Sequence, residues 1–200
     1  MKLAVLASGS GTNLQAIIDD VLSGYIPAEL KIVISDKEGA YALTRAEQAG
    51  IPTQVVLPKD FASREEYDAK VVEILKANGV EYVALAGYMR LVSKVFLDAF
   101  PNRVVNIHPA LLPSFPGVHG QRDAVEYGVK VSGCTVHFVD EDMDHGPIIA
   151  QAPVPVLHTD TEETLKERIL EQEHILFPHV LRLIAQGKVE VQGRKVIIKD

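Results

Sequence analysis

Asn106 and His108 are the two residues of this chain whose types and spacing most plainly suggest chemistry. They lie two apart in an apolar stretch that begins at Val104, and alternate residues of a strand project to the same face. A carboxamide can donate a hydrogen bond to a developing negative charge, and an imidazole can shuttle protons near neutral pH. Pro109 has no backbone N–H, so the strand should end there, and open α/β sheets place ligands at such strand ends. The alternative is that neighbouring backbone groups satisfy both side chains and neither does chemistry.

A glycine-rich turn from Ser8 to Asn13 has the composition of an anion-binding site. It follows the apolar stretch Leu3–Ala7, which predicts a buried strand, and precedes an amphipathic helix from about Leu14 to Leu22. Small residues let backbone N–H groups approach a phosphate, and the helix N-terminus adds positive potential. Leu14 stands where a dinucleotide fingerprint needs its third glycine, and no Gly-Lys-Ser/Thr sequence follows, so neither a dinucleotide site nor a P-loop is expected. A purely structural turn is the alternative.

Two further loops follow predicted strands. Gly87–Val92 leaves the strand Tyr82–Ala86 and is mostly apolar, which suits the wall of a pocket for a flat ligand. A loop folded back onto the core is the alternative. Asp140–Pro147 is acidic, and most of its carboxylates are expected to be solvated. The ligand spacing of a calcium loop, with its closing Glu, is absent, so we expect no metal there.

The order of predicted elements indicates an α/β fold. Strands alternate with helices in the first half, which predicts a Rossmann-like open, mostly parallel twisted sheet with helices on both faces, and the second half is more antiparallel. Right-handed crossovers would bring the turn, the Gly87–Val92 loop and the Asn106/His108 pair to one edge of the sheet, where they would line one cleft. We expect a single domain, 1–200, with halves 1–100 and 101–200. The other expected elements are strand Leu30–Ser35, helix Ala40–Ala49, strand Thr53–Leu57, a helix after the capping box Ser63/Glu66, a helix capped by Ser93, helix Arg122–Tyr127, strands Val131–Val139 and Ile148–Val156, a helix capped by Asp160 and Glu163, and a hairpin Val189–Ile198.

Composition excludes several classes of protein. The formal net charge is −7, which disfavours a nucleic-acid partner because phosphate contacts require clustered Lys and Arg. Cys134 is the only cysteine, so no disulfide and no Cys-rich metal site are expected. No run of about 18 apolar residues is present, and the first residues lack the pattern of a signal peptide. We therefore expect no membrane association and a cytoplasmic location.

Four stretches carry a family resemblance in the same order across nearly the whole chain: Ser8–Gln15, Ala86–Arg90, Asn106–Pro113 and His137–Asp144. They resemble the phosphoribosylglycinamide formyltransferase family, the folate-dependent enzymes of purine synthesis. The Asn-x-His-Pro-x-Leu-Leu-Pro block is specific to the wider formyltransferase fold, and the glycine-rich turn narrows the resemblance to this family. The resemblance implies transfer of a formyl group from the co-substrate 10-formyltetrahydrofolate to the primary amine of glycinamide ribonucleotide. It implies no metal, and we expect a monomer or weak homodimer.

The resemblance also implies roles for individual residues. Asn106 would be the oxyanion donor, His108 the acid or electrostatic partner, and Asp144 the carboxylate that favours the charged imidazole. The sequence alone does not select Asp144 from its acidic neighbours. The ribonucleotide would contact Gly11, Thr12, Asn13, Pro109 and Glu173. Its phosphate would bind to Gly11, Thr12 and Asn13, in the 1–100 half. The folate would contact Arg64, Met89, Arg90, Leu91, Val92, Asn106, Asp140, Glu141, Asp142, Met143 and Asp144, and the 101–200 half would carry catalysis. His145 departs from the small residue that the family pattern favours.

Three other functions remain open at this point. Formyltetrahydrofolate hydrolase shares the Asn, His and Asp set, but it carries a regulatory domain before the first strand, so we expect it less. Methionyl-tRNA formyltransferase shares the Leu-Leu-Pro loop, but it needs a further C-terminal domain and a basic surface. The third is a nucleotide-phosphate binding module without catalysis. A metal site is disfavoured because the spacings of the candidate ligands fit no compact pattern: His108, His119, His137 and His145.

Overall fold

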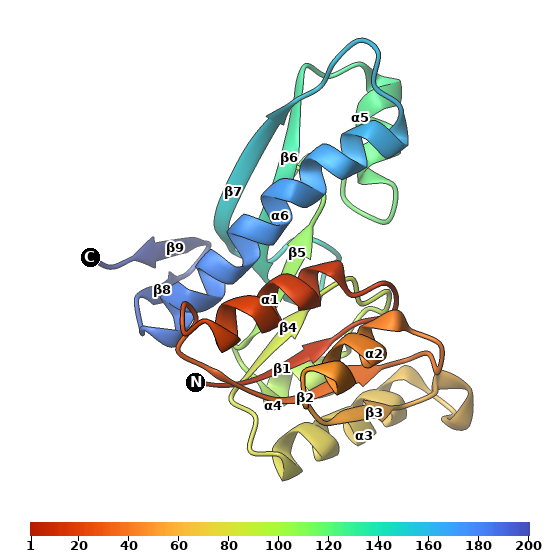
Figure 1. Ribbon diagram of the computed structural model, residues 1–200, viewed down its shortest axis with the longest axis vertical. Helices are drawn as coiled ribbons and strands as arrows, with labels where there is room; N and C mark the ends of the chain where they lie inside the picture. Colours follow the sequence, from red (N-terminus) through yellow and green to blue (C-terminus); the bar gives the residue numbers. More distant parts are fainter. The chain divides into compact units, whose positions relative to one another are not determined.

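The computed structural model describes residues 1–200 and divides into two compact units, Met1–Asn106 and Ile107–Asp200 (Figure 1). The boundary between the two units falls inside strand β5, Val104–His108. β5 is therefore the strand along which the chain passes from the first unit to the second. No helix is both long enough and apolar enough to span a membrane.

The first unit contains a parallel sheet in the order β3-β2-β1-β4-β5. Its middle strand β1 is buried along Leu3–Leu6, because a central parallel strand has helices over both faces. The strands are β1 (Lys2–Leu6), β2 (Glu29–Ser35), β3 (Thr53–Val55), β4 (Tyr82–Leu85) and β5. The helices are α1 (Thr12–Leu22), α2 (Tyr41–Gln48), the short 3₁₀ helix η1 (Pro58–Asp60), α3 (Arg64–Ala77) and α4 (Lys94–Ala99).

The strand order explains where the helices of this unit lie. The chain moves outward from β1 to β3 and then returns to β4 on the other side of β1. Right-handed crossovers therefore place α1 and α2 on one face and α3 and α4 on the other. The packing agrees, since α1 contacts α2 and α3 contacts α4 (Figure 1). The carboxyl ends of β1, β4 and β5 lie along one edge, as predicted from the sequence.

The second unit is built on an antiparallel pair, β6 (Val131–Phe138) and β7 (Ile148–Pro155). Helix α6 (Glu162–Ala185) packs against both strands through one fully buried row: Leu165, Ile169, Phe177 and Leu181. The unit also contains α5 (Gly120–Tyr127) and the hairpin β8 (Val189–Gln192) and β9 (Lys195–Ile198). A Cβ at Gly133 would stand 2.0 Å from the Ala152 carbonyl oxygen, so only glycine lets β6 approach β7 at this point.

The α/β fold with a more antiparallel second half is confirmed, and most element bounds differ by one to three residues from those expected. One capping assignment is wrong. The N-cap of α6 is Thr161, whose side chain and that of Thr164 form the capping box. Asp160 instead accepts hydrogen bonds from Arg168 at 2.7 and 2.9 Å and from the Leu157 N–H. Arg168 holds the pKa of Asp160 well below its ordinary value.

Candidate active site

The glycine-rich turn ends at Gly11, which adopts the left-handed conformation (φ 72°) at the N-cap of α1. No side chain caps this helix, so the N–H groups of its first turn are not used by a capping residue. A Cβ on Gly11 would lie 2.6 Å from the Ala42 Cα, which excludes a larger residue. Thr12 and Asn13 form the first helical positions and are half-buried. The start of α1 thus has the uncapped N–H groups that an anion site requires.

The loop after β4 is joined to this turn. The Ser8 N–H donates to the Gly87 carbonyl at 3.0 Å, and the Ser8 hydroxyl accepts from the Met89 N–H at 2.9 Å. Asn106 on β5 is in register with Leu85, at the end of β4, and is half-buried. The first unit therefore brings the glycine-rich turn and the Met89–Val92 loop together at one sheet edge.

Side chains of helix α3 contact residues at both ends of the Met89–Val92 loop and within it. The Tyr67 and Tyr88 hydroxyls are 2.9 Å apart, and Arg90 stacks 4.6 Å from the centre of the Tyr67 ring. The Asp68 carboxylate accepts from the Ser93 N–H at 2.5 Å, and burial raises the pKa of Asp68. Val92 is buried, whereas Met89 and Leu91 are 60% and 48% exposed. The loop is thus fixed at its ends and presents apolar side chains outward. The predicted folate contact Arg64, at the start of α3, is exposed and lies 3.8 Å from Glu65.

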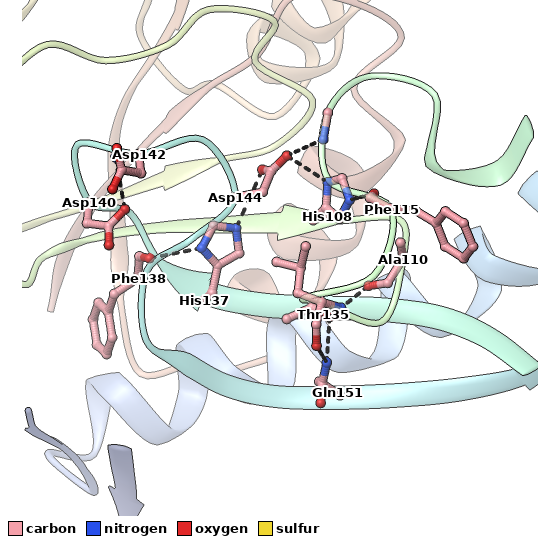
Figure 2. A network of polar contacts seen from close by, with 12 residues as sticks. His108, Ala110, Phe115, Thr135, His137, Phe138, Asp140, Asp142, Asp144 and Gln151 are labelled. Atoms are coloured by element: carbon pink, nitrogen blue, oxygen red, sulfur yellow. Dashed lines mark hydrogen bonds and ion pairs between the residues drawn. The ribbon is translucent and has the colours of Figure 1, made fainter. Parts of the chain in front are cut away.

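In the second unit, His108 and Asp144 form a nearly buried pair. The Asp144 Oδ2 lies 3.5 Å from Nδ1 of His108, and the side chains are 12% and 4% exposed. The other ring nitrogen, Nε2, lies 2.8 Å from the Phe115 carbonyl oxygen. A carbonyl can only accept, so Nε2 carries a hydrogen. The carboxylate of Asp144 is also an acceptor, so one acceptor lies beside each ring nitrogen of His108 (Figure 2).

The backbone conformation of Asp144 places its carboxylate beside the His108 imidazole. Asp144 has φ 51°, a left-handed conformation that is uncommon for residues other than glycine. Its Oδ2 also accepts from the Gly117 N–H at 2.8 Å. At the next glycine, Gly146, a side chain would force the backbone to move, because a Cβ there would lie 1.8 Å from the Phe138 carbonyl oxygen. The Asp140–Pro147 loop is therefore constrained by close packing at Gly146 and by the Asp144–Gly117 hydrogen bond.

A second imidazole lies on the far side of the carboxylate. His137 Nε2 is 3.9 Å from Asp144 Oδ1, and Nδ1 is 2.9 Å from the Phe138 carbonyl oxygen. Figure 2 shows the carboxylate between His137 and His108. Burial lowers the pKa of His137 and outweighs the opposing influence of Asp144. A neutral His137 leaves the negative charge of Asp144 available to His108.

The segment after His108 is anchored to β6. The Thr135 hydroxyl donates to the Ala110 carbonyl at 2.7 Å and accepts from the Leu112 N–H at 3.1 Å. Gln151 on β7 donates to the Leu112 carbonyl at 2.9 Å. These bonds fix the chain between His108 and the Phe115 carbonyl that contacts the ring.

The rest of the acidic loop is more open. Asp140 accepts from the Asp142 N–H at 3.1 Å, and its carboxylate lies 2.8 Å from Nδ1 of His145. Glu141, Asp142 and Met143 are exposed. No group of three or more His, Cys, Asp or Glu residues is placed to hold a metal ion.

Pro109 and Glu173, the remaining predicted ribonucleotide contacts, differ in burial. Pro109 is half-buried directly after β5. Glu173 is buried on α6, although most polar residues of that helix are exposed, and its charge helps to raise the pKa of Cys134. Glu173 lies between Ile169 and Phe177 in the buried row of α6, and a buried carboxylate among apolar side chains is a marker of function.

Sequence reasoning did not assign site roles to His137, Thr135, Phe115 and Gly117. His137 and Thr135 alternate on β6, and this period of two was an available signal. Phe115 and Gly117 contribute backbone groups, whose use depends on the path of the loop and has no side-chain signature.

The chain is similar to known proteins along nearly its whole length. The family model described as formyl transferase matches residues 1–181. Phosphoribosylglycinamide formyltransferase from Escherichia coli (strain K12) is 41% identical over 96% of this chain and 90% of that protein. The trifunctional purine biosynthetic protein adenosine-3 of Drosophila melanogaster is 52% identical over 93% of this chain, which matches only 14% of that protein's length.

Solved structures give the same result for the fold. The crystal structure of glycinamide ribonucleotide transformylase 1 from Symbiobacterium toebii matches with a TM-score of 0.99 and 54% identity, over 100% of this chain and 94% of that chain. Both the fold and the sequence of the two units are thus those of known formyltransferases. This chain belongs to the formyl transferase family.

Proposed function

We propose that this chain transfers a formyl group from 10-formyltetrahydrofolate to the primary amine of glycinamide ribonucleotide. The observation that carries the proposal is the His108–Asp144 pair, with a carboxylate oxygen 3.5 Å from one ring nitrogen and a carbonyl oxygen 2.8 Å from the other. This arrangement places an acceptor beside each ring nitrogen, so both nitrogens can hold a hydrogen, and the reaction can use the ring as an acid or as a positive charge. The relatives described above are named for the same activity, which supports the proposal.

The reaction needs both charge stabilisation and proton movement. The amine nitrogen forms a bond to the formyl carbon, and the carbonyl electron pair moves onto the formyl oxygen. When the bond from carbon to the folate nitrogen breaks, its electron pair goes to that nitrogen, which takes a proton, while the amine loses one. Asn106 donates a hydrogen bond to the formyl oxygen, and the His108 imidazolium stabilises the same charge and can supply the proton. The Asp144 carboxylate faces the ring at 3.5 Å and places a negative charge beside it.

The glycine-rich turn binds the ribonucleotide phosphate in this proposal. Gly11, Thr12 and Asn13 supply the uncapped start of α1, where N–H groups and the helix dipole favour an anion. Pro109 and Glu173 contact the rest of the ribonucleotide. The buried carboxylate of Glu173 suits a hydroxyl-bearing ribose because it is an acceptor for O–H groups.

The folate supplies the formyl carbon and a nitrogen leaving group when it is bound. The exposed apolar side chains of Met89 and Leu91 fit a flat ring, and Arg90 and Val92 fix the loop that carries them. Arg64 and Asp140–Asp144 complete the proposed folate contacts. The exposed Arg64 offers a positive charge to the acidic tail of a folate.

A folate absorbance assay tests the proposal. The protein is incubated with 10-formyltetrahydrofolate, with and without glycinamide ribonucleotide, and release of tetrahydrofolate is followed. We expect release only when the amine is present, with formation of the formylated ribonucleotide confirmed by mass spectrometry. Release without the amine would indicate a hydrolase, and no release in either case would indicate a binding module. Either of these outcomes overturns the proposal.

A further inference from the structure

Helix α2, which also contacts α1, is hydrogen-bonded to the glycine-rich turn. The Ala42 N–H donates to the Gly9 carbonyl at 3.0 Å, and the Arg45 Nε donates to the Ser10 carbonyl at 2.7 Å. The two carbonyl oxygens that precede Gly11 are therefore both bound by α2. Carbonyl oxygens carry partial negative charge and would repel a phosphate, so binding them here leaves N–H groups as the polar groups at the start of α1.

Arg45 is fixed by three partners, and none of them is charged. Besides the Ser10 carbonyl, Nη1 donates to the Gln15 side-chain oxygen at 3.3 Å, and the guanidinium lies 4.9 Å from the centre of the Tyr41 ring. Arg168 shows the contrasting arrangement, since its guanidinium is paired with the carboxylate of Asp160. The charge of Arg45 is not neutralised by a contacting carboxylate, so it adds positive potential beside the turn.

Gln15 connects this arrangement to α1. It lies in the first turns of α1, and its N–H donates to the Gly11 carbonyl at 2.9 Å. Arg45 thus bridges the residue before Gly11 and a residue on the helix that follows it. A planar guanidinium can reach both acceptors at fixed angles, whereas a lysine ammonium offers a single point charge.

We propose that Arg45 is a positioning residue for the substrate phosphate. It hydrogen-bonds the Ser10 carbonyl oxygen, which would otherwise be free to repel the phosphate, and it adds a positive charge that no carboxylate contacts beside the turn. This inference rests on the proposed function, because it takes the turn to be the phosphate site. Arg45 acts through the turn and is not a catalytic residue. Its loss should weaken binding of the phosphorylated substrate and leave the chemical step intact.

The test compares Arg45→Gln, Arg45→Lys and the control Arg103→Gln. Arg103 is a matched control because it is an exposed arginine that also lies over a tyrosine ring, Tyr82, and has no contact with the turn. Arg45→Gln should raise KM for glycinamide ribonucleotide about 10- to 100-fold, the scale of a hydrogen bond to a charged group. The kcat and the KM for the formyl donor should stay within about twofold. Arg45→Lys should fall between Arg45→Gln and the wild type.

The same measurements on the phosphate-free riboside separate positioning from a general structural role. The wild type and Arg45→Gln should then have kcat/KM values within about twofold of each other, because the site affected is empty. The inhibition constant of inorganic phosphate should rise together with KM for the ribonucleotide. An equal loss on the ribonucleotide and the riboside, or the same effect from Arg103→Gln, overturns the inference.

A failure of the proposed function gives a different pattern. If the wild type transfers no formyl group, binding of inorganic phosphate by calorimetry decides the role of Arg45. Weaker binding by Arg45→Gln supports it, and equal binding overturns it. If Arg45→Gln does not fold, the comparison of Arg45→Lys with the wild type decides: an unchanged KM for the ribonucleotide contradicts the inference.

Discussion

The Asp144 carboxylate lies 3.5 Å from the His108 ring, although the two residues are far apart in the chain and come from a loop and a strand end. The contact depends on the left-handed conformation of Asp144 and on the Gly117 N–H, which holds the same carboxylate oxygen. The pair is almost fully buried, so water screens its interaction little. The chemistry of the family is therefore expected to depend on this contact.

Replacing His108 with Ala should lower kcat by roughly 10²–10⁴-fold, the usual scale for loss of a general acid or base. KM for both substrates should change little, because the turn and the apolar loop that we propose bind them are not altered. Steady-state kinetics with His158→Gln as the control measure this, since His158 is exposed. Turnover of His108→Ala at the wild-type rate would remove the imidazole from the mechanism.

Replacing Gly146 with Ala should displace the Asp144 loop. The added methyl would meet the Phe138 carbonyl at 1.8 Å, so the backbone must move, at a cost of about 1–3 kcal/mol in unfolding free energy. We expect a lower kcat together with lower stability. Gly39→Ala is the control, because nothing lies within 4 Å of a Cβ there. Equal stability and activity of the two variants would show that the loop is not constrained at Gly146.

Buried His137 should make the fold less stable in mild acid. Burial lowers its pKa, so below the ordinary value of about 6.5 the unfolded chain binds a proton that the folded chain resists. The associated stability is full above about pH 6.5 and declines as pH falls, by at most about 1.4 kcal/mol per pH unit. Denaturant unfolding at pH 7.5 and 5.5 should show a smaller decline in His137→Gln than in the wild type. Parallel declines would contradict this.

Cys134 should be inert in the folded protein. It is fully buried, and burial, with the charge of Glu173 added, raises its pKa to about 12. At pH 8 this leaves on the order of 10³-fold less thiolate than an exposed cysteine of ordinary pKa. A thiol reagent should modify it only after denaturant is added. Modification of the native protein at the rate of a free cysteine would show that the β6 strand opens.

The sequence predicted the parts of the site that follow a short-range pattern. Asn106 and His108 were identified from a period of two at a strand end, and the glycine-rich turn from its place between a strand and a helix. Asp144 could not be selected from its acidic neighbours by sequence pattern alone, because its φ of 51° and its contact with the Gly117 N–H depend on tertiary packing. The shift of the α6 cap from Asp160 to Thr161 has a similar cause, since Arg168 engages Asp160 from two turns along the helix.

The kcat of Asp144→Asn tests the central claim most directly, namely that the negative charge of Asp144 beside the His108 ring supports formyl transfer. The asparagine oxygen can still accept from the Gly117 N–H, so the loop should keep its path while the negative charge is lost. We expect kcat to fall roughly 10- to 100-fold, the scale of a contact with a charged group, with little change in KM for either substrate. Asp98→Asn, which removes a surface partner of Lys94, should leave kcat unchanged. A kcat of Asp144→Asn equal to that of the wild type would contradict the account.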